Sequence, residues 1–327
     1  MYKLSDKDKE SIKSFNSKLK ENIEIKYIES GSKEDALVDD FLSSLSQSAS
    51  KITIQKEKKG TNHLPEIVVT DNIRYSAVPL SNELKPFLKA LSLKSYNKNF
   101  KLSDTVRKNL DKISIPIKLK LFAANACPHC PVVVEGMLDI ANECKNIELS
   151  IIDPAIFTEE ATVNSVLSVP CLILDDDIRW TGSVSMEEVT DVLADRDSST
   201  LKAPTLRRIL EHGKASWLAD QMIEKNMIFP EFIKLVVHEI WSVRLGAMVV
   251  IEELAEKKFD LANTICKFLW EKFPKAAMDV KGDILYAIGE SGKSEDIHLI
   301  EKELITLETE DLQEAAKDAI EEIKLRS

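Results

Sequence analysis

The chain has 327 residues, of which 44% are hydrophobic and 30% are charged, and its formal net charge is −11. This length allows two or three domains, and the acidic balance argues against a nucleic-acid partner, because phosphate binding needs a basic surface. No apolar run approaches the ~20 residues of a membrane span, and residues 1–10 contain no apolar segment typical of a secretory signal. Five cysteines do not make a disulfide framework, so we expect a cytoplasmic protein with no membrane partner.

Residues 1–100 are expected to form the first of three domains. Apolar residues alternate in some stretches and recur at helical spacing in others, which predicts mixed strands and helices. Ser81 is expected to cap the last helix. The predicted elements are helix 5–19, strand 23–28, helix 35–45, strands 51–55, 65–69 and 73–78, and helix 82–91.

Residues 101–197 are expected to form a second domain with the same order of elements. Two copies of one pattern indicate an internal duplication. The first copy contains no cysteine, so it cannot perform thiol chemistry. The predicted elements of the second copy are helix 104–112, strand 117–122, helix 131–141, strand 147–152, helix 159–166, strands 171–174 and 178–181, and a helix capped near Ser185.

The second copy contains two cysteines three positions apart, Cys127 and Cys130, where a predicted strand gives way to a predicted helix. Unpaired N–H groups and the dipole at a helix N-terminus favour a thiolate. We therefore expect Cys127 to be the exposed nucleophile and Cys130 to be the more buried thiol that resolves a mixed disulfide. Pro128 is expected to keep the turn rigid and His129 to tune the thiolate, although a merely solvated His129 fits the sequence as well.

The alternative use of this pair is one half of a zinc site. Tetrahedral zinc needs four ligands, usually two such pairs. The other cysteines, Cys144, Cys171 and Cys266, are scattered and form no second pair. We therefore expect no metal site and favour redox chemistry.

Downstream, Val169-Pro170-Cys171 enters an apolar strand. A C-x-x-C pair followed by such a proline resembles the thioredoxin/glutaredoxin superfamily. The resemblance implies that the Val169–Pro170 bond is cis and that Pro170 faces Cys127. It also implies that Val169 and Pro170 dock the extended chain of a protein substrate. Cys171 would then lie near the active thiols, either as a small buried residue or as a third thiol that exchanges with Cys127.

The two copies, of which only the second carries cysteines, resemble the protein disulfide oxidoreductases with two tandem thioredoxin folds. They are also similar, around residues 73–81 and 122–131, to the N-terminal domain of the flavoprotein component of alkyl hydroperoxide reductase. The resemblance implies a thioredoxin-like fold without active cysteines in residues 1–100 and a glutaredoxin-like active fold in residues 101–197. The glycine-rich motif of a dinucleotide-binding domain is missing, so we expect no cofactor, and electrons from a separate reductase or a small thiol.

Residues 201–327 are expected to form a third, all-helical domain after a turn-rich stretch at 197–200. Pro204 and Pro230 are each expected to open a helix. Similar apolar patterns recur at roughly 35-residue intervals, which is similar to HEAT-type repeats and typical of surfaces that bind a protein partner. An irregular helical bundle is the alternative.

The predicted fold class is therefore α/β plus all-α, with two tandem thioredoxin folds and a HEAT-like domain. The predicted function is a thiol–disulfide oxidoreductase that acts on protein disulfides through Cys127 and Cys130. Two other functions stay open. One is a redox-sensing adaptor whose helical repeats bind a protein, and the other is a metal or iron–sulfur carrier.

Overall fold

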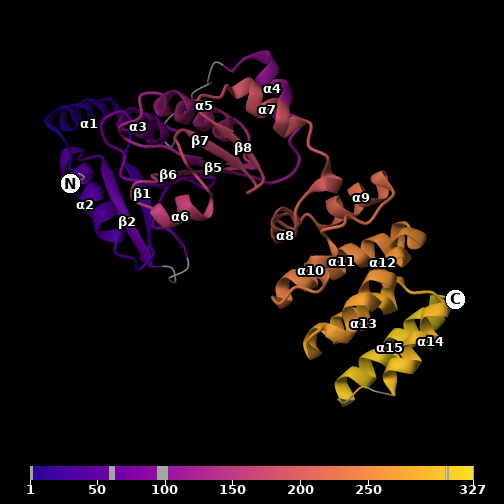
Figure 1. Ribbon diagram of the computed structural model, residues 1–327. Helices are drawn as coiled ribbons and strands as arrows, with labels where there is room; N and C mark the ends of the chain where they lie inside the picture. The colour runs from indigo at the N-terminus through magenta and orange to yellow at the C-terminus, as the bar shows by residue number, and fades with distance from the viewer. Residues whose placement is uncertain (1–2, 59–62, 94–101, 306, 308, 327) are drawn as a thin grey trace. The chain divides into compact units, whose positions relative to one another are not determined.

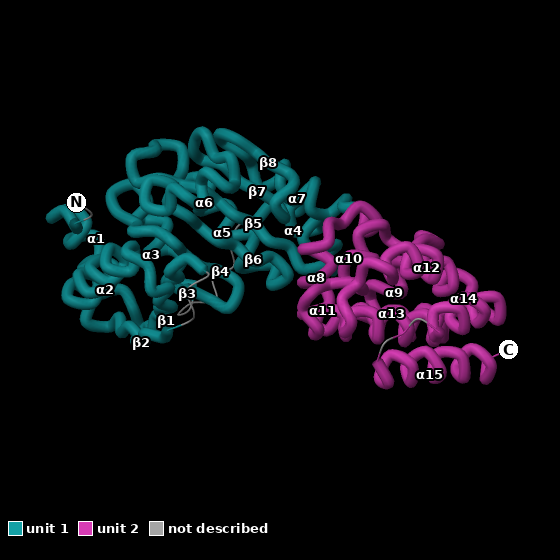
Figure 2. Tube along the Cα trace, turned by 60° about the horizontal axis from the view of Figure 1, so that its bottom comes forward, with its two compact units in different colours: residues 1–196 teal, residues 197–327 magenta. Residues whose placement is uncertain are grey.

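The computed structural model describes the chain except for residues 1–2, 59–62, 94–101, 306, 308 and 327. The described residues form two compact units, 1–196 and 197–327 (Figures 1 and 2). Strands occur in the first unit, whereas the described part of the second unit is built from helices. The boundary falls at the turn-rich stretch that the sequence indicates.

The described residues of the first unit form an eight-stranded sheet, accompanied by helices. All the strands and helices expected for residues 1–197 are present, with bounds that differ by a few residues from the predicted ones. The elements are α1 (Asp6–Lys18), β1 (Ile23–Glu29), α2 (Asp35–Ser48), β2 (Ile52–Lys58), β3 (Glu66–Thr70), β4 (Ile73–Ser76), α3 (Leu84–Ser92), α4 (Asp104–Leu110), β5 (Ile117–Phe122), α5 (Cys130–Glu143), β6 (Ile147–Ile152), α6 (Thr158–Val163), β7 (Cys171–Leu174), β8 (Ile178–Thr181) and α7 (Met186–Ala194).

The strand order β2-β1-β3-β4-β6-β5-β7-β8 divides the sheet into two halves with the same pairing. In each half the first two strands in chain order pair in parallel, and the remaining neighbours pair antiparallel. The halves join through a parallel pair, β4 with β6, in which Tyr75 lies opposite Ile151. The repeated pattern therefore builds one continuous sheet, and its buried residues form one continuous core.

Strand β5 leads into the cysteine motif, and its sequence explains its place inside the sheet. Ile117, Leu119 and Leu121 are fully buried, because alternate residues of a strand point to the same face. Lys118 and Lys120 point to the other face and are only half-buried. This strand is paired on both sides, by β6 and β7, so the loop that follows it starts from a fixed point.

The prediction that Ser81 caps the third helix is wrong. The backbone of Ser81 is left-handed, with φ of 50°, and its N–H donates to the Asp8 carboxylate at 3.2 Å. A residue that caps a helix with its side chain typically has an extended backbone, whereas Ser81 lies in a turn and α3 begins three residues later, at Leu84. The residue before the helix is Glu83, and its backbone N–H bonds to the Leu80 carbonyl at 3.0 Å.

The described part of the second unit contains α-helices and two short 3-10 helices, Ser198–Thr200 and Phe273–Lys275. Pro204 lies in the first turn of α8, as predicted, whereas Pro230 lies in the turn before α10 and does not open it. The helices are α8 (Ala203–Glu211), α9 (Ala215–Lys225), α10 (Ile233–Val236), α11 (Trp241–Lys257), α12 (Phe259–Lys272), α13 (Met278–Ser291), α14 (Ser294–Leu304) and α15 (Glu310–Arg326).

A buried arginine ties two of these helices together. Arg244 of α11 is 1% exposed, and its guanidinium pairs with Asp279, at 2.8 Å, and Asp283 of α13. The same group donates to the carbonyl oxygens of His238 and Glu239, at 2.7 and 3.0 Å. Because a buried charge needs partners on all its donors, this network fixes how α11 and α13 pack.

Candidate active site

The two cysteines of the motif lie between the end of β5 and the start of α5. Cys127 is half-buried in the connecting loop, and its N–H donates to the Ala124 carbonyl at 2.9 Å. Cys130 is the first residue of α5 and is fully buried. Its backbone N–H donates to the Cys127 sulfur at 3.1 Å. The helix N-terminus therefore directs one of its unpaired N–H groups at Cys127, which is the arrangement that stabilises a thiolate.

The two thiols have unequal surroundings. Burial raises the pKa of Cys130 far above its ordinary value, and the hydrogen bond with Cys127 and the negative charge of Glu83 raise it further. Cys130 is thus held as a protonated thiol under a more accessible Cys127. This inequality fits the predicted order, in which Cys127 attacks first. Pro128 and His129, between them, are exposed, and their tuning roles stay predictions.

The loop before β7 faces the dithiol. The Val169–Pro170 peptide bond is cis, as the resemblance implies, and the Cys127 thiol donates to the Val169 carbonyl at a sulfur–oxygen distance of 3.8 Å. Pro170 is buried, and its carbonyl accepts a hydrogen bond from the Gly182 N–H at 2.8 Å. The backbone of Val169 is thus held directly beside the sulfur that a substrate must reach.

Cys171 is 2% exposed and lies in the sheet, opposite Phe122 on one side and Thr181 on the other. Burial raises the pKa of its thiol. A thiol that stays protonated is a poor nucleophile, so these surroundings favour the interpretation of Cys171 as a small buried residue. Cys144 and Cys266 are buried as well, and neither is close to the motif in the chain.

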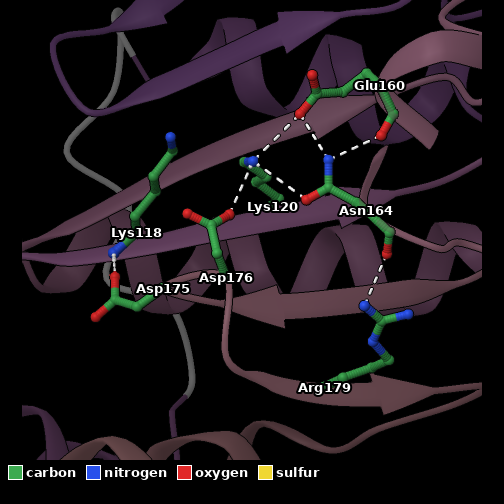
Figure 3. A network of polar contacts seen from close by, with 7 residues as sticks. All are labelled: Lys118, Lys120, Glu160, Asn164, Asp175, Asp176 and Arg179. Atoms are coloured by element: carbon green, nitrogen blue, oxygen red, sulfur yellow. Dashed lines mark hydrogen bonds and ion pairs between the residues drawn. The ribbon is translucent and has the colours of Figure 1, made fainter. Parts of the chain in front are cut away.

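A polar network fixes the helix that precedes the Val169–Pro170 loop (Figure 3). Lys120 of β5 is 15% exposed and pairs with Glu160 of α6, at 3.2 Å, and with Asp176 of the β7–β8 turn, at 2.9 Å. Its ammonium also donates to the Asn164 side chain at 3.2 Å. The half-buried Lys120 thus joins α6, the sheet and the β7–β8 turn at one point.

The end of α6 is held by a second cation in the same network. Arg179 of β8 donates to the carbonyl oxygens of Asn164, at 2.7 Å, and Ser165, at 2.8 Å. The last carbonyl groups of a helix lack partners inside it, so the guanidinium caps α6. It also sets the direction of the chain toward Val169, four residues beyond Ser165.

We expect Arg179→Ala to weaken the loop without unfolding the protein. The change removes two charge-assisted hydrogen bonds of an exposed side chain, and such bonds contribute about 1.5–3 kcal/mol when they are well shielded and less when they are exposed. Thiol exchange with a peptide disulfide should slow about threefold to tenfold, which corresponds to about 0.7–1.4 kcal/mol. Arg74→Ala, which breaks an ion pair with Glu66 in the other half of the sheet, is the matched control. Equal rates for both variants would contradict a positioning role for Arg179.

The structure also adds a titratable residue that the sequence did not indicate, Glu83. Its side chain is 5% exposed, and neither carboxylate oxygen has a hydrogen-bond partner within the described part of the chain. Burial raises the pKa of Glu83 to about 7, and the charges of Asp153 and Glu135 add to the shift. The negative charge of Glu83 also raises the pKa of Cys130. A glutamate before a helix is ordinary in a sequence, which is why it gave no signal.

The half of the sheet without cysteines also supports the loop of the motif directly. The Asn125 amide donates to the Val78 carbonyl at 2.9 Å and accepts from the Leu80 N–H at 2.7 Å. The Asn82 amide donates to the carbonyl of Cys127 at 3.4 Å. The first half is therefore part of the site, although it has no thiol.

Within the described residues, no group of three or more His, Cys, Asp and Glu side chains is arranged to hold a metal ion. None of the helices in the described ranges is both long and apolar enough to span a membrane.

Comparison with known proteins agrees with this geometry. Residues 117–194 match the thioredoxin domain. The matched range contains β5, both cysteines of the motif and the Val169–Pro170 loop. The chain is also 25% identical over 81 residues to a thioredoxin of Methanocaldococcus jannaschii, a match that covers 24% of this chain and 95% of that protein. The expectation of a thioredoxin-type oxidoreductase domain is thereby confirmed.

A second relative matches a longer stretch. The chain is 26% identical over 135 residues to a component of the alkyl hydroperoxide reductase of Pseudomonas aeruginosa. The match covers 40% of this chain but spans only 26% of that component. The similarity to this group is confirmed, and it concerns one part of a much longer relative.

Two solved structures show the same fold. The NTD_N/C domain of the alkyl hydroperoxide reductase of Enterococcus faecalis superimposes with a TM-score of 0.50 and 20% identity, over 58% of this chain and 100% of that one. A protein disulfide oxidoreductase of Aeropyrum pernix gives a TM-score of 0.51 and 13% identity, over 59% of this chain and 93% of that one. The fold of the first unit is thus found in both groups.

Proposed function

We propose that the chain is a thiol–disulfide oxidoreductase that reduces disulfides of partner proteins. The Cys127 thiolate attacks one sulfur of the partner disulfide, which forms a mixed disulfide and releases the first partner thiol. Cys130 then attacks the Cys127 sulfur, which closes the Cys127–Cys130 disulfide and releases the second partner thiol. The partner gains two electrons and the dithiol loses two. The observation that carries this proposal is the Cys130 N–H bonded to the Cys127 sulfur at 3.1 Å, above a buried Cys130 thiol.

The second step requires that Cys130 lose its proton in a buried place. We propose Glu83 as the group that accepts it, because its buried carboxyl has a pKa of about 7, has no hydrogen-bond partner among the described residues, and acts through its charge on the Cys130 thiol. A base whose pKa lies near the working pH is present in its ionised form and still regains a proton readily. Glu83 would pass this proton to the departing partner thiolate or to water.

The surroundings of Cys127 favour a protein as the substrate. Leu167 is 97% exposed, two residues before Val169, and Val132 is 76% exposed, two residues after Cys130. Exposed large apolar side chains beside a reactive group mark a contact surface. The Val169 backbone would pair with an extended segment of the partner, in the manner of an added strand.

The catalytic cycle needs an electron donor that reopens the Cys127–Cys130 disulfide. We assign this role to a separate reductase or a small thiol, without a resident cofactor. The first unit is proposed to be two tandem thioredoxin folds that share one sheet, with a boundary near residue 100, since the strand pairing repeats in both halves. The second unit is proposed to be HEAT-like and to bind a protein partner.

The test of this function is the reduction of insulin by dithiothreitol, followed as turbidity. The full chain should accelerate the reaction well above the rate with dithiothreitol alone, and a variant with both cysteines of the motif changed to serine should not. A chain that binds no substrate disulfide and shows no acceleration would overturn the proposal. It would leave the redox-sensing adaptor as the function that fits the two units.

A chain that ends at Arg196 should fold and reduce insulin within about twofold of the full-length rate, since a difference that small amounts to about 0.4 kcal/mol. The reason is that residues 1–196 contain the whole sheet, its core and every residue of the site. Circular dichroism and the turbidity assay would check both parts. An insoluble product would show that the helices complete the core of the first unit.

A further inference from the structure

The helical unit carries a groove that the dithiol chemistry does not use. Two adjoining hollows of about 400 Å³ each lie along α11, α13 and α15, and Tyr286 and Glu290 line both of them. Gly289 lines one hollow, and a Cβ atom at this position would come within 3.0 Å of the Ala319 Cα. Because α13 and α15 approach so closely there, the bottom of the groove is backbone and small side chains.

Two contacts show that the C-terminal parts of the three helices meet at this groove. The Tyr286 hydroxyl of α13 donates to the Glu252 carboxylate of α11 at 2.8 Å. Arg326, at the end of α15, pairs with Glu290, near the end of α13, at 3.2 Å. The buried Arg244 network holds α11 and α13 together from inside the unit. The groove is thus a fixed feature of the packed helices.

The groove combines exposed apolar groups with negative charge. Tyr286 is 44% exposed and Leu325 is 74% exposed. Among the described residues, Arg326 is the one cation that lines the two hollows, whereas the acidic residues that line them are Glu252, Glu256, Glu290, Asp318, Glu321 and Glu322.

The position of one of these acids, Glu290, is unfavourable for the helix that carries it. The C-terminus of a helix already carries partial negative charge, so carboxylates there destabilise it. The last turn of α13 contains no basic residue, and Glu290 lies in it. A sequence that breaks a local rule without a gain in stability usually does so at a functional site.

An apolar track extends from the groove along α11. Trp241, Leu245 and Val249 are 59%, 43% and 36% exposed, and they follow one another at intervals of four residues toward Glu252. Residues at this spacing lie on one face of a helix. The surface is therefore apolar at the start of α11 and acidic at its end.

We propose that this surface binds an amphipathic, basic segment of a partner protein. Apolar side chains of the segment would cover the track on α11, and its lysine or arginine residues would enter the groove. There they would meet the six carboxylates and the ring of Tyr286, which attracts a cation through its face. Because the groove repels phosphate, a nucleic acid or an anionic lipid surface does not fit it.

The test uses the full-length chain and a fluorescent amphipathic peptide made of lysine and leucine, with a peptide of glutamate and leucine as the counterpart. Anisotropy should show binding of the lysine peptide only, and the affinity should fall as salt rises, because salt screens exposed charges. Glu256→Lys with Glu322→Lys should weaken binding at least about tenfold, as expected for charge reversal at an interface. The matched control is Glu271→Lys with Glu301→Lys, on α12 and α14, which should stay within about twofold.

Variants of Tyr286 distinguish binding in a shaped groove from attraction by diffuse negative charge. Tyr286→Ala should weaken binding about fivefold or more, whereas Tyr286→Phe, which keeps the ring, should bind like the wild type within about twofold. Equal affinity for all variants, or an equal loss in the control pair, would overturn the proposal. Circular dichroism identifies a variant that fails to fold. If Tyr286→Ala does not fold, the comparison of the groove pair Glu256→Lys and Glu322→Lys with the control pair still tests the proposal. Insulin reduction should be unchanged throughout, so failure here is distinguishable from failure of the proposed function.

Discussion

Replacement of Cys130 by serine should convert the protein into a trap for its substrates, whereas replacement of Cys127 should silence it. Without the Cys130 thiol, the mixed disulfide between Cys127 and the partner cannot be resolved and accumulates. Without the Cys127 thiol, the accessible nucleophile is lost, and the rate should fall on the order of 10³-fold or more, as when other enzymes lose their nucleophile. Non-reducing electrophoresis after incubation with an oxidised protein substrate would show a new, dithiothreitol-sensitive band with Cys130→Ser only.

Alkylation of the reduced protein tests whether the two thiols differ in reactivity. The N–H of Cys130 is bonded to the Cys127 sulfur, and burial raises the pKa of the Cys130 thiol. Iodoacetamide should therefore modify Cys127 much faster than Cys130 in the reduced protein. Cys266 offers a matched internal control, because burial raises its pKa to about 12 and it lies in the other unit. Faster modification of Cys130 would reverse the assignment.

Glu83→Gln should slow the resolution of the mixed disulfide at least about tenfold at neutral pH, toward the lower end of general-base effects. In the wild type this step should accelerate as pH rises through about 7, where Glu83 loses its proton. The variant should lack this rise. Stopped-flow measurement of the release of the second partner thiol, between pH 5 and 9, would resolve the two profiles. Glu143→Gln, an exposed acid at the end of the same α5 helix as Cys130, should leave the profile unchanged.

Glu83 should also limit stability at high pH, and the sign follows from its raised pKa. The folded state holds the proton up to about pH 7, whereas the unfolded chain releases it near 4.5. Stability is therefore lost as pH rises between these values and stays lower above them. The free energy of unfolding of Glu83→Gln should exceed that of the wild type by about 3 kcal/mol at pH 8, because folding raises the pKa of Glu83 from 4.5 to about 7. The two proteins should have nearly the same free energy of unfolding below pH 4.5.

Urea unfolding at the two pH values would measure this difference. A gain in stability without a change in the resolution rate would show that Glu83 is buried but is not the base. A variant that behaves like the wild type in both measurements would show that the carboxyl ionises as an exposed one does. The two readouts therefore separate a catalytic from a merely buried carboxyl.

The sequence predicted the strands and helices of the first unit well, because their apolar residues follow the periods of strand and helix. It also led us to expect Cys127, Cys130 and Pro170 in the site, because their order along the chain is itself the signal, and their roles stay predictions. The structure does place Cys127 beside Cys130 and beside the cis Val169–Pro170 bond. The sequence did not predict Glu83, since its burial depends on a turn at Ser81 and on the approach of the two halves of the sheet. A periodic pattern describes local structure, and it contains no information on which distant side chains meet.

The wrong prediction that Ser81 caps α3 also arises from a contact between distant segments. Ser81 satisfies the local preference for an N-cap, but the Asp8 carboxylate of α1 holds its N–H and a left-handed backbone results. The network of Lys120 and Arg179 was likewise hidden, because its members come from β5, α6 and β8. In each case a contact between distant segments decides the outcome.

The parallel pairing of β4 with β6 means that the cysteine-bearing half of the sheet should not function as an isolated domain. Transplanted alone, it would present β6 as an open edge, and unpaired backbone groups on such an edge recruit other chains. It would also leave behind the carboxyl of Glu83 and the amide of Asn82. Selection on the chemistry of the two thiols therefore also acts on the half of the sheet that has no cysteine. Loss of that half would cause aggregation before it caused slower thiol exchange.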